Sequence, residues 1–289
     1  MVPGVTVEGR KPHPAPVPTP EQRAFVKSHA APSRIGQMTR WRQSICPKTF
    51  GLSAAMNDFV SQHVKDVAAD VGAPSGPCKS NVVIVFTSDP QKLLDSVRKK
   101  APVLLGFHYP AQAKRIATVT QPIQAWYVTA TTSGASGGGL GAAGTGILSG
   151  ALGAADSGAG ADGLAIDDGC CGTPGGCAGS HFTACLSNQI VAVIVVANPN
   201  QVAGMTIGSI SDYIAMLVLT KVDPSQGCSD PASITNLFAA RCDEGSKPTA
   251  LTADDTAYLK ALYSINMSQV MWVQQDSLAD IMASALDGH

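Results

Sequence analysis

Residues 189–221, QIVAVIVVANPNQVAGMTIGSISDYIAMLVLTK, decide the fold of this chain. The run Ile190–Ala197 is apolar without interruption, which is typical of a strand buried on both faces of a sheet. A turn containing Gly204 leads into a second segment, 209–220, whose apolar side chains recur at helical spacing. A buried strand followed by a buried helix predicts a mixed α/β (α+β) fold, with a small sheet packed with helices.

The rest of the sequence predicts further elements of the same two kinds. The helix expected over 54–71 has Ser53 as its N-cap, places Met56 and Val60 on its apolar face, and ends at Gly72. The next helix begins at Asp89-Pro90, where proline suits the first turn. The full set is a helix over 54–71, a strand over 81–87, a helix over 91–100, strands over 123–131 and 190–197, and helices over 209–220, 231–240, 252–263 and 276–286.

The chain divides by composition into one domain and two irregular segments. Residues 1–35 carry repeated prolines, so this segment is expected to be extended, with 6–8 able to pair as an edge strand. Residues 36–289 form the single domain. Within it, 133–187 is a Gly/Ala- and Cys-rich insertion with too few bulky side chains for a core of its own.

Charge argues against nucleic acid as a partner, and hydropathy argues against a membrane-spanning segment. The formal net charge is -1 and charged residues make up 14% of the chain, so no basic stripe is available for a phosphate backbone and nucleic acid is not expected as a partner. No apolar run approaches the roughly 20 residues that cross a bilayer. The N-terminus lacks the apolar core of a secretory signal, and we interpret the chain as a mature protein with a start Met.

The cysteines indicate an oxidising compartment. The chain has eight and no CxxC pair, so disulfides are favoured over a zinc ribbon or a redox site, and the expected location is periplasmic or extracellular. Cys228 and Cys242 are spaced for one closed loop, whereas the pairing within the insertion stays open. The disulfide candidates are Cys46, Cys78, Cys170, Cys171, Cys177, Cys185, Cys228 and Cys242.

Two catalytic patterns occur in the Gly-rich insertion. Residues 134–138 fit GxSxG with Ser136 as the nucleophile, and 139–144 fit GxGxxG with Asp162 near the ribose-binding distance. Neither pattern opens a packed helix, which both chemistries require. A biased composition generates such patterns by chance, so we interpret the segment as a linker and expect no cofactor.

The six histidines do not predict a zinc site. No two are four residues apart and HExxH is absent, so no helix presents two imidazoles to one ion. His181 lies between Cys177 and Cys185, where disulfides are favoured over a Cys/His site. His63 is expected as a satisfied surface residue. His108 either lines a groove with Tyr109 or belongs to a packed turn.

The helix over 209–220 supplies the remaining site candidates. Tyr213 and Met216 belong to its apolar stripe, so they are expected in the core. Asp212 is a carboxylate on an apolar helix and must be exposed or hydrogen-bonded. We favour a structural partner for it, a backbone amide or a basic group, over general-base chemistry.

The order of elements, with LTADDTAYLKALY at 251–263, resembles the small zincin-like metalloprotease domains of secreted bacterial proteins. IGQMTRWRQSICPK at 35–48 and the segment 107–131 are similar to an uncharacterised family of bacterial secreted proteins. The resemblance implies a zincin-like core. It also implies His-Glu-x-x-x-Gln or His-Glu-x-x-His on the metal helix, where this chain has 211–216, SDYIAM. No metal ligand or catalytic residue carries over.

We therefore expect a non-catalytic secreted or envelope protein that binds a protein partner or self-associates. One alternative is a secreted hydrolase with a non-zinc site, such as Ser136. Another is a structural subunit of an extracellular assembly, in which 6–8 or the insertion adds to a neighbouring sheet edge.

Overall fold

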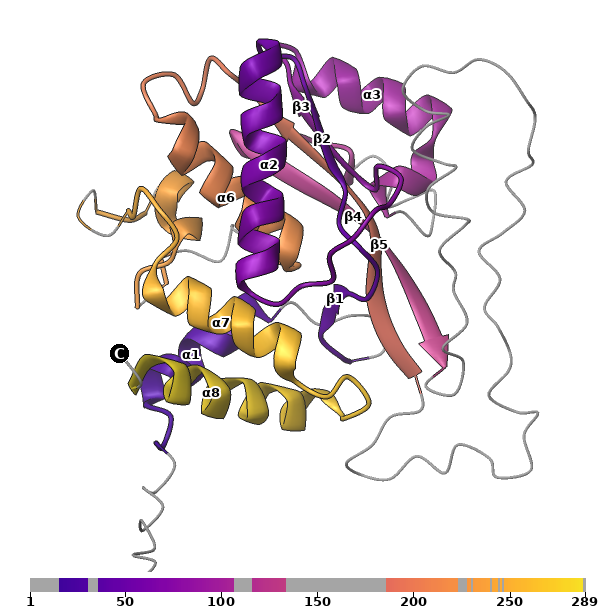
Figure 1. Ribbon diagram of the computed structural model, residues 1–289. Helices are drawn as coiled ribbons and strands as arrows, with labels where there is room; N and C mark the ends of the chain where they lie inside the picture. Colours follow the sequence, from indigo (N-terminus) through magenta and orange to yellow (C-terminus); the bar gives the residue numbers. More distant parts are fainter. Residues whose placement is uncertain are drawn as a thin grey trace, which may run out of the picture.

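The computed structural model describes residues 16–30, 36–106, 116–133, 186–222, 228–229, 231–239, 241–243, 245 and 247–287. Over these residues the chain is mixed α/β, a largely parallel sheet packed with helices on both faces (Figure 1). The fold class predicted from the sequence is therefore confirmed. Among the described helices, none is long and apolar enough to cross a membrane.

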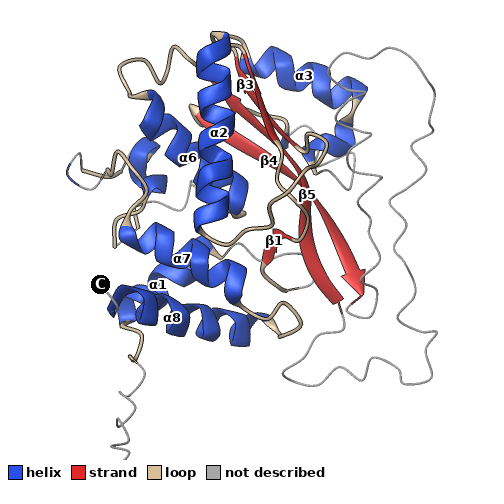
Figure 2. Cartoon of the chain, viewed as in Figure 1, coloured by secondary structure: helices blue, strands red, loops and turns tan. Residues whose placement is uncertain are grey.

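Strand β5 (Leu186–Ala197) is the centre of the sheet. Strand β4 (Ile123–Ser133) pairs antiparallel with it along its whole length. The other edge of β5 is shared: β1 (Thr39–Trp41) pairs parallel with its first half and β3 (Val82–Phe86) pairs parallel with its second half. Strand β2 (Pro47–Phe50) adds to β3, also parallel. Figure 2 shows the strands in red and the helices in blue.

Helices cover the two faces of the sheet unequally. One face packs against α2 (Ala54–Asp70), α6 (Ile207–Leu219), α1 (Pro20–His29), α7 (Ala253–Ser264) and α8 (Met271–Asp287). The opposite face packs against α3 (Pro90–Lys100) and the 3-10 turn η1 (Pro102–Leu105). A second 3-10 turn, η4 (Ile234–Phe238), lies beside α6. Strand β5 contributes side chains to both cores, as its unbroken apolar run predicts.

Local signals fix the beginnings of the helices. The Ser53 hydroxyl accepts from the backbone N–H of Met56 at the start of α2. Thr252 and Asp255 form a reciprocal capping box at the start of α7, as the sequence predicts with Asp in place of Glu. Helix α8 begins at Met271, earlier than the predicted residue 276.

The extended conformation predicted for 1–35 is wrong where the structure describes a helix, in α1. Pro20 occupies the first helical turn, where its missing N–H is not needed, and Thr19 and Gln22 form a capping box. Phe25 and Val26 are buried in the main core, so α1 is part of the domain. Residues 1–15 and 31–35, including the predicted edge strand 6–8, lie outside the described part of the chain.

Two disulfides join described residues, Cys46–Cys78 and Cys228–Cys242. The second is the closed loop predicted from the spacing. The first ties the segment before β2 to the loop before β3, and the side chain of Asn81 reinforces this contact by bonding to Cys46 N at 2.8 Å and Ser44 O at 2.8 Å. The candidates Cys170, Cys171, Cys177 and Cys185 lie outside the described residues.

Candidate functional site

Asp212 and His63 meet between α6 and α2. Both helices follow strands of the parallel sheet and pack side by side on the same face (Figure 1). His63 Nε2 lies 2.5 Å from Asp212 Oδ1, and the side chains are 27% and 15% exposed. A partly buried pair of this kind makes a charge-assisted hydrogen bond when the histidine is protonated.

The second oxygen of Asp212 is also bonded. The backbone N–H of Leu251, just before α7, donates to Oδ2 over 3.3 Å. Asp212 thus has both kinds of structural partner that its position predicts, a basic group and a backbone amide. The carboxylate joins α2, α6 and the entry to α7 at one point.

The His63 ring is held in place by its neighbours and is hydrogen-bonded to Asp212. Within the described chain it has no hydrogen bond to a hydroxyl or thiol that could act as a nucleophile. Its ring stacks on Phe59, one turn earlier in α2, with the ring centres 5.8 Å apart and the planes at 21°. In a hydrolase triad the imidazole lies between the carboxylate and a hydroxyl or thiol. No serine, threonine or cysteine of the described residues forms a hydrogen bond with His63. Asp212 and His63 therefore resemble the acid and the base of a triad, but no described hydroxyl or thiol is bonded to His63 for the imidazole to activate.

Tyr213 and Met216, the neighbours of Asp212 on α6, face the core. Both are completely buried, and the Tyr213 ring packs edge-on against Phe238 with centres 4.8 Å apart. Burial raises the pKa of the Tyr213 hydroxyl, which has no hydrogen-bond partner within the described residues. Tyr213 is thus a core residue that carries an unsatisfied polar atom. The other candidate, His108, lies outside the described part of the chain, as does Ser136.

A second polar cluster joins His29, Ser233 and Asp255, and sequence reasoning missed it. Ser233 Oγ donates to Asp255 Oδ1 over 2.5 Å and lies 3.1 Å from His29 Nε2. The other ring nitrogen of His29 is 2.9 Å from the carbonyl oxygen of Phe25. These three residue types also make catalytic triads, but here the serine stands between the acid and the histidine, and all three side chains are buried.

The cluster of His29, Ser233 and Asp255 holds elements of the folded chain together. Asp255 Oδ2 also accepts from the backbone N–H of Ile234 at 2.8 Å and of Thr252 at 3.0 Å, so the carboxylate fixes η4 onto α7. Desolvation lowers the pKa of His29, opposed by its bond to the Phe25 carbonyl and by the charge of Asp255. The cluster therefore links α1, η4 and α7 in the core.

The side chains able to coordinate a metal ion are dispersed over the described part of the chain. Within the described residues no three His, Cys, Asp or Glu side chains come together in a group able to hold a metal ion. Asp212 and His63 make a pair without a third ligand. We call the contacts of Asp212 with His63 and with the backbone N–H of Leu251 the Asp212 clamp, because they join α2, α6 and the entry to α7.

No protein-family model matches this chain, and no curated protein or solved structure matches it either.

Proposed function

We propose that this protein is a non-catalytic secreted or envelope protein that acts by binding protein, copies of itself included. The scaffold would be zincin-like, with a metal helix that has lost its ligands. The observation that carries the proposal is the Asp212 clamp. Both oxygens of the carboxylate are bonded within the fold, and its neighbours Tyr213 and Met216 are buried.

The disulfides support the proposed compartment. Cys46–Cys78 and Cys228–Cys242 each close a loop, and such bonds persist in oxidising environments. A loop closed by a disulfide lowers the entropy of the unfolded chain, which suits a protein that works outside the cell.

A binding function also fits the large apolar side chains that remain on the surface. Trp272 is 53% exposed and Phe59 is 45% exposed, on α8 and α2 respectively. Aromatic side chains are enriched at the centres of protein interfaces because they bury a large area with few rotatable bonds. Both side chains offer contact area to a partner, and Phe59 also stacks on His63 of the Asp212 clamp.

The test uses the purified full chain with its disulfides intact. Sedimentation velocity over a dilution series should show association that depends on concentration, and a serine-directed fluorophosphonate should leave the protein unlabelled. Stoichiometric labelling of Ser136 would contradict the proposal and support the hydrolase alternative. A chain that stays monomeric and retains no envelope protein on an affinity matrix would also contradict it.

A further inference from the structure

Exposed lysines gather on α3 and its surroundings. From Lys79 to Lys100 the chain carries five basic and two acidic residues, and one of the acidic residues, Asp95, is 3.5 Å from Arg98. Lys48 on β2 is also exposed, and its Nζ lies 5.2 Å from the centre of the Phe50 ring, which is 36% exposed. We define the basic surface by the exposed lysines of α3: Lys92, Lys99 and Lys100.

Helix α8 carries the opposite charge on its solvent side. It contains three aspartates and no basic residue, and all three aspartates are exposed. Trp272, Asp276 and Asp280 follow one another at intervals of one helical turn, so they lie along one ridge. Arg23 of α1 makes an exposed contact of 3.2 Å with Asp276, a pair that contributes little in water. We define the acidic ridge as Trp272, Asp276, Asp280 and Asp287.

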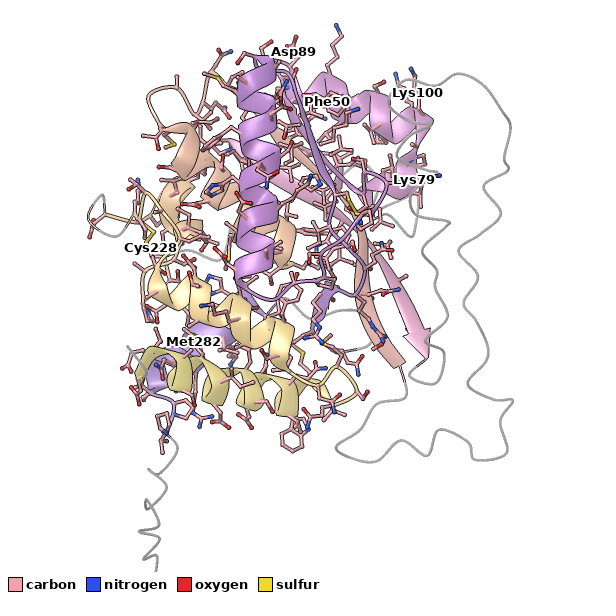
Figure 3. The ribbon with its side chains drawn as sticks, viewed as in Figure 1. Phe50, Lys79, Asp89, Lys100, Cys228 and Met282 are labelled. Carbon is pink, nitrogen blue, oxygen red and sulfur yellow. A yellow bond between two sulfur atoms is a disulfide. The ribbon has the colours of Figure 1, made fainter. Side chains whose placement is uncertain are left out.

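The two surfaces lie at opposite ends of the molecule. In Figure 1, α3 is at the upper right and α8 is at the bottom. Figure 3 places Lys79 and Lys100 together on the side away from Met282 of α8. Surfaces this far apart cannot neutralise each other within one chain, but they are placed to do so between two chains.

We propose that copies of this chain associate head to tail, with the acidic ridge of one copy seated on the basic surface of the next. This inference rests on the proposed function, because it names the partner as a second copy. Opposite potentials steer the two surfaces together and select their orientation.

Charge also argues against a symmetric dimer through either surface. A two-fold contact would place lysines against lysines or aspartates against aspartates, and like charges opposed at an interface destabilise it. A head-to-tail contact leaves one unused surface at each end. Such contacts close into rings or extend into filaments.

Charge reversal on each surface tests the proposal. Lys99→Glu with Lys100→Glu gives a chain that is acidic at both ends, and Asp276→Lys with Asp280→Lys gives one that is basic at both ends. Sedimentation velocity should show self-association of the wild type at low salt, weakened at high salt because screening acts over about 10 Å at 0.1 M. Each variant alone should associate at least about tenfold more weakly, whereas an equimolar mixture of the two should recover association.

The mixture keeps the test independent of damage to the fold, since misfolded variants would not recover. Asp58→Lys with Asp66→Lys on α2 is the control: it changes the net charge by the same amount, on a helix that belongs to neither surface. It should associate like the wild type at matched ionic strength. Electron microscopy of the associated wild type should show rings or filaments.

Three results would overturn the inference. One is a wild type that is monomeric at low salt, and another is reversal variants that associate as the wild type does. The third is a mixture that fails to recover association although both variants retain the circular dichroism spectrum of the wild type. If the wild type associates but charge reversal has no effect, the head-to-tail contact is wrong and the proposed binding function stands. Labelling of Ser136 would instead remove the proposed function itself.

Discussion

His63 Nε2 and Asp212 Oδ1 lie 2.5 Å apart, although the two residues are 149 positions apart in the sequence. The contact joins α2 to α6 on one face of the sheet. The bond from Leu251 N to the same carboxylate extends the contact to α7. One side chain thereby fixes three elements that the chain reaches at widely separated points.

Replacing Asp212 with Asn should lower the free energy of unfolding by about 1–3 kcal/mol, the range for losing a hydrogen bond to a charged group. The amide keeps the shape of the side chain but not its charge. Chemical denaturation at neutral pH measures the loss. Asp66→Asn on α2 is the matched control: Asp66 accepts from Gln62 at 2.7 Å on an exposed surface, so its change should stay within about 0.5 kcal/mol. Equal losses of unfolding free energy for the two variants would show that the Asp212 clamp stabilises the fold no more than an exposed hydrogen bond does.

Replacing Tyr213 with Phe should raise the free energy of unfolding by up to about 1 kcal/mol. The hydroxyl is buried without a partner among the described residues, and removing an unsatisfied polar group ends its desolvation cost. Tyr258→Phe is the matched comparison, because that buried hydroxyl donates to the carbonyl oxygen of His29 over 3.0 Å. It should lower stability by about 1 kcal/mol. Thermal or urea unfolding measures the change in unfolding free energy for both variants, expected to be positive for Tyr213→Phe and negative for Tyr258→Phe. A loss of stability in Tyr213→Phe would contradict this and indicate that the hydroxyl has a partner.

Gly51 should tolerate alanine much less well than Gly72, although both flank α2 and have positive φ angles, 97° and 75°. A Cβ at Gly51 would lie 2.0 Å from the carbonyl oxygen of Phe86, whereas a Cβ at Gly72 would have no atom within 4 Å. Gly72→Ala should cost about 1 kcal/mol for the left-handed backbone alone. Gly51→Ala must also displace the end of β3, so its cost should exceed that value. Denaturation midpoints of the two variants make the comparison, and similar values would contradict it.

Strands β3, β4 and β5 and most of the covering helices were predictable because their signals are local, whereas the short strands β1 and β2 were not predicted. The unbroken apolar run of β5 and the Thr252–Asp255 capping box each fit within a few residues. The prediction of which residues form the apolar face of α2 was less accurate. Met56 was expected on it but is 49% exposed, because the helix turns Val60, Val64 and Ala68 toward the core. Helix α1 was missed because its prolines were given more weight than the Thr19–Gln22 cap that precedes Phe25.

The polar contacts of the candidate site were not predictable, since no periodicity relates their residues. Asp212 was expected to find a basic group or an amide, but the sequence does not show that the group is His63. The cluster at Ser233 joins residues 204 positions apart, from His29 to Ser233. Such pairs follow from the crossing of helices on one face of a sheet, and that crossing is set by the whole core.

Acidification should destabilise the protein through His29. Burial lowers the pKa of this side chain below its ordinary value of 6.5, so the unfolded chain binds a proton at a pH where the folded chain does not. The stability that neutral His29 contributes is therefore full above pH 6.5 and is lost as the pH falls through the lowered pKa of the folded state.

The free energy of unfolding should thus fall as the pH is lowered from about 6.5 toward the lowered pKa of folded His29, by no more than about 1.4 kcal/mol per pH unit for one proton. His29→Asn removes the titrating group. This variant should be less stable than the wild type near pH 7.5, because it loses the stacking on Phe25, with ring centres 4.0 Å apart. Its stability should also change less with pH over this interval, in which most carboxylates stay ionised. If the free energy of unfolding changed with pH in the same way for the wild type and His29→Asn, the pH dependence would belong to another group.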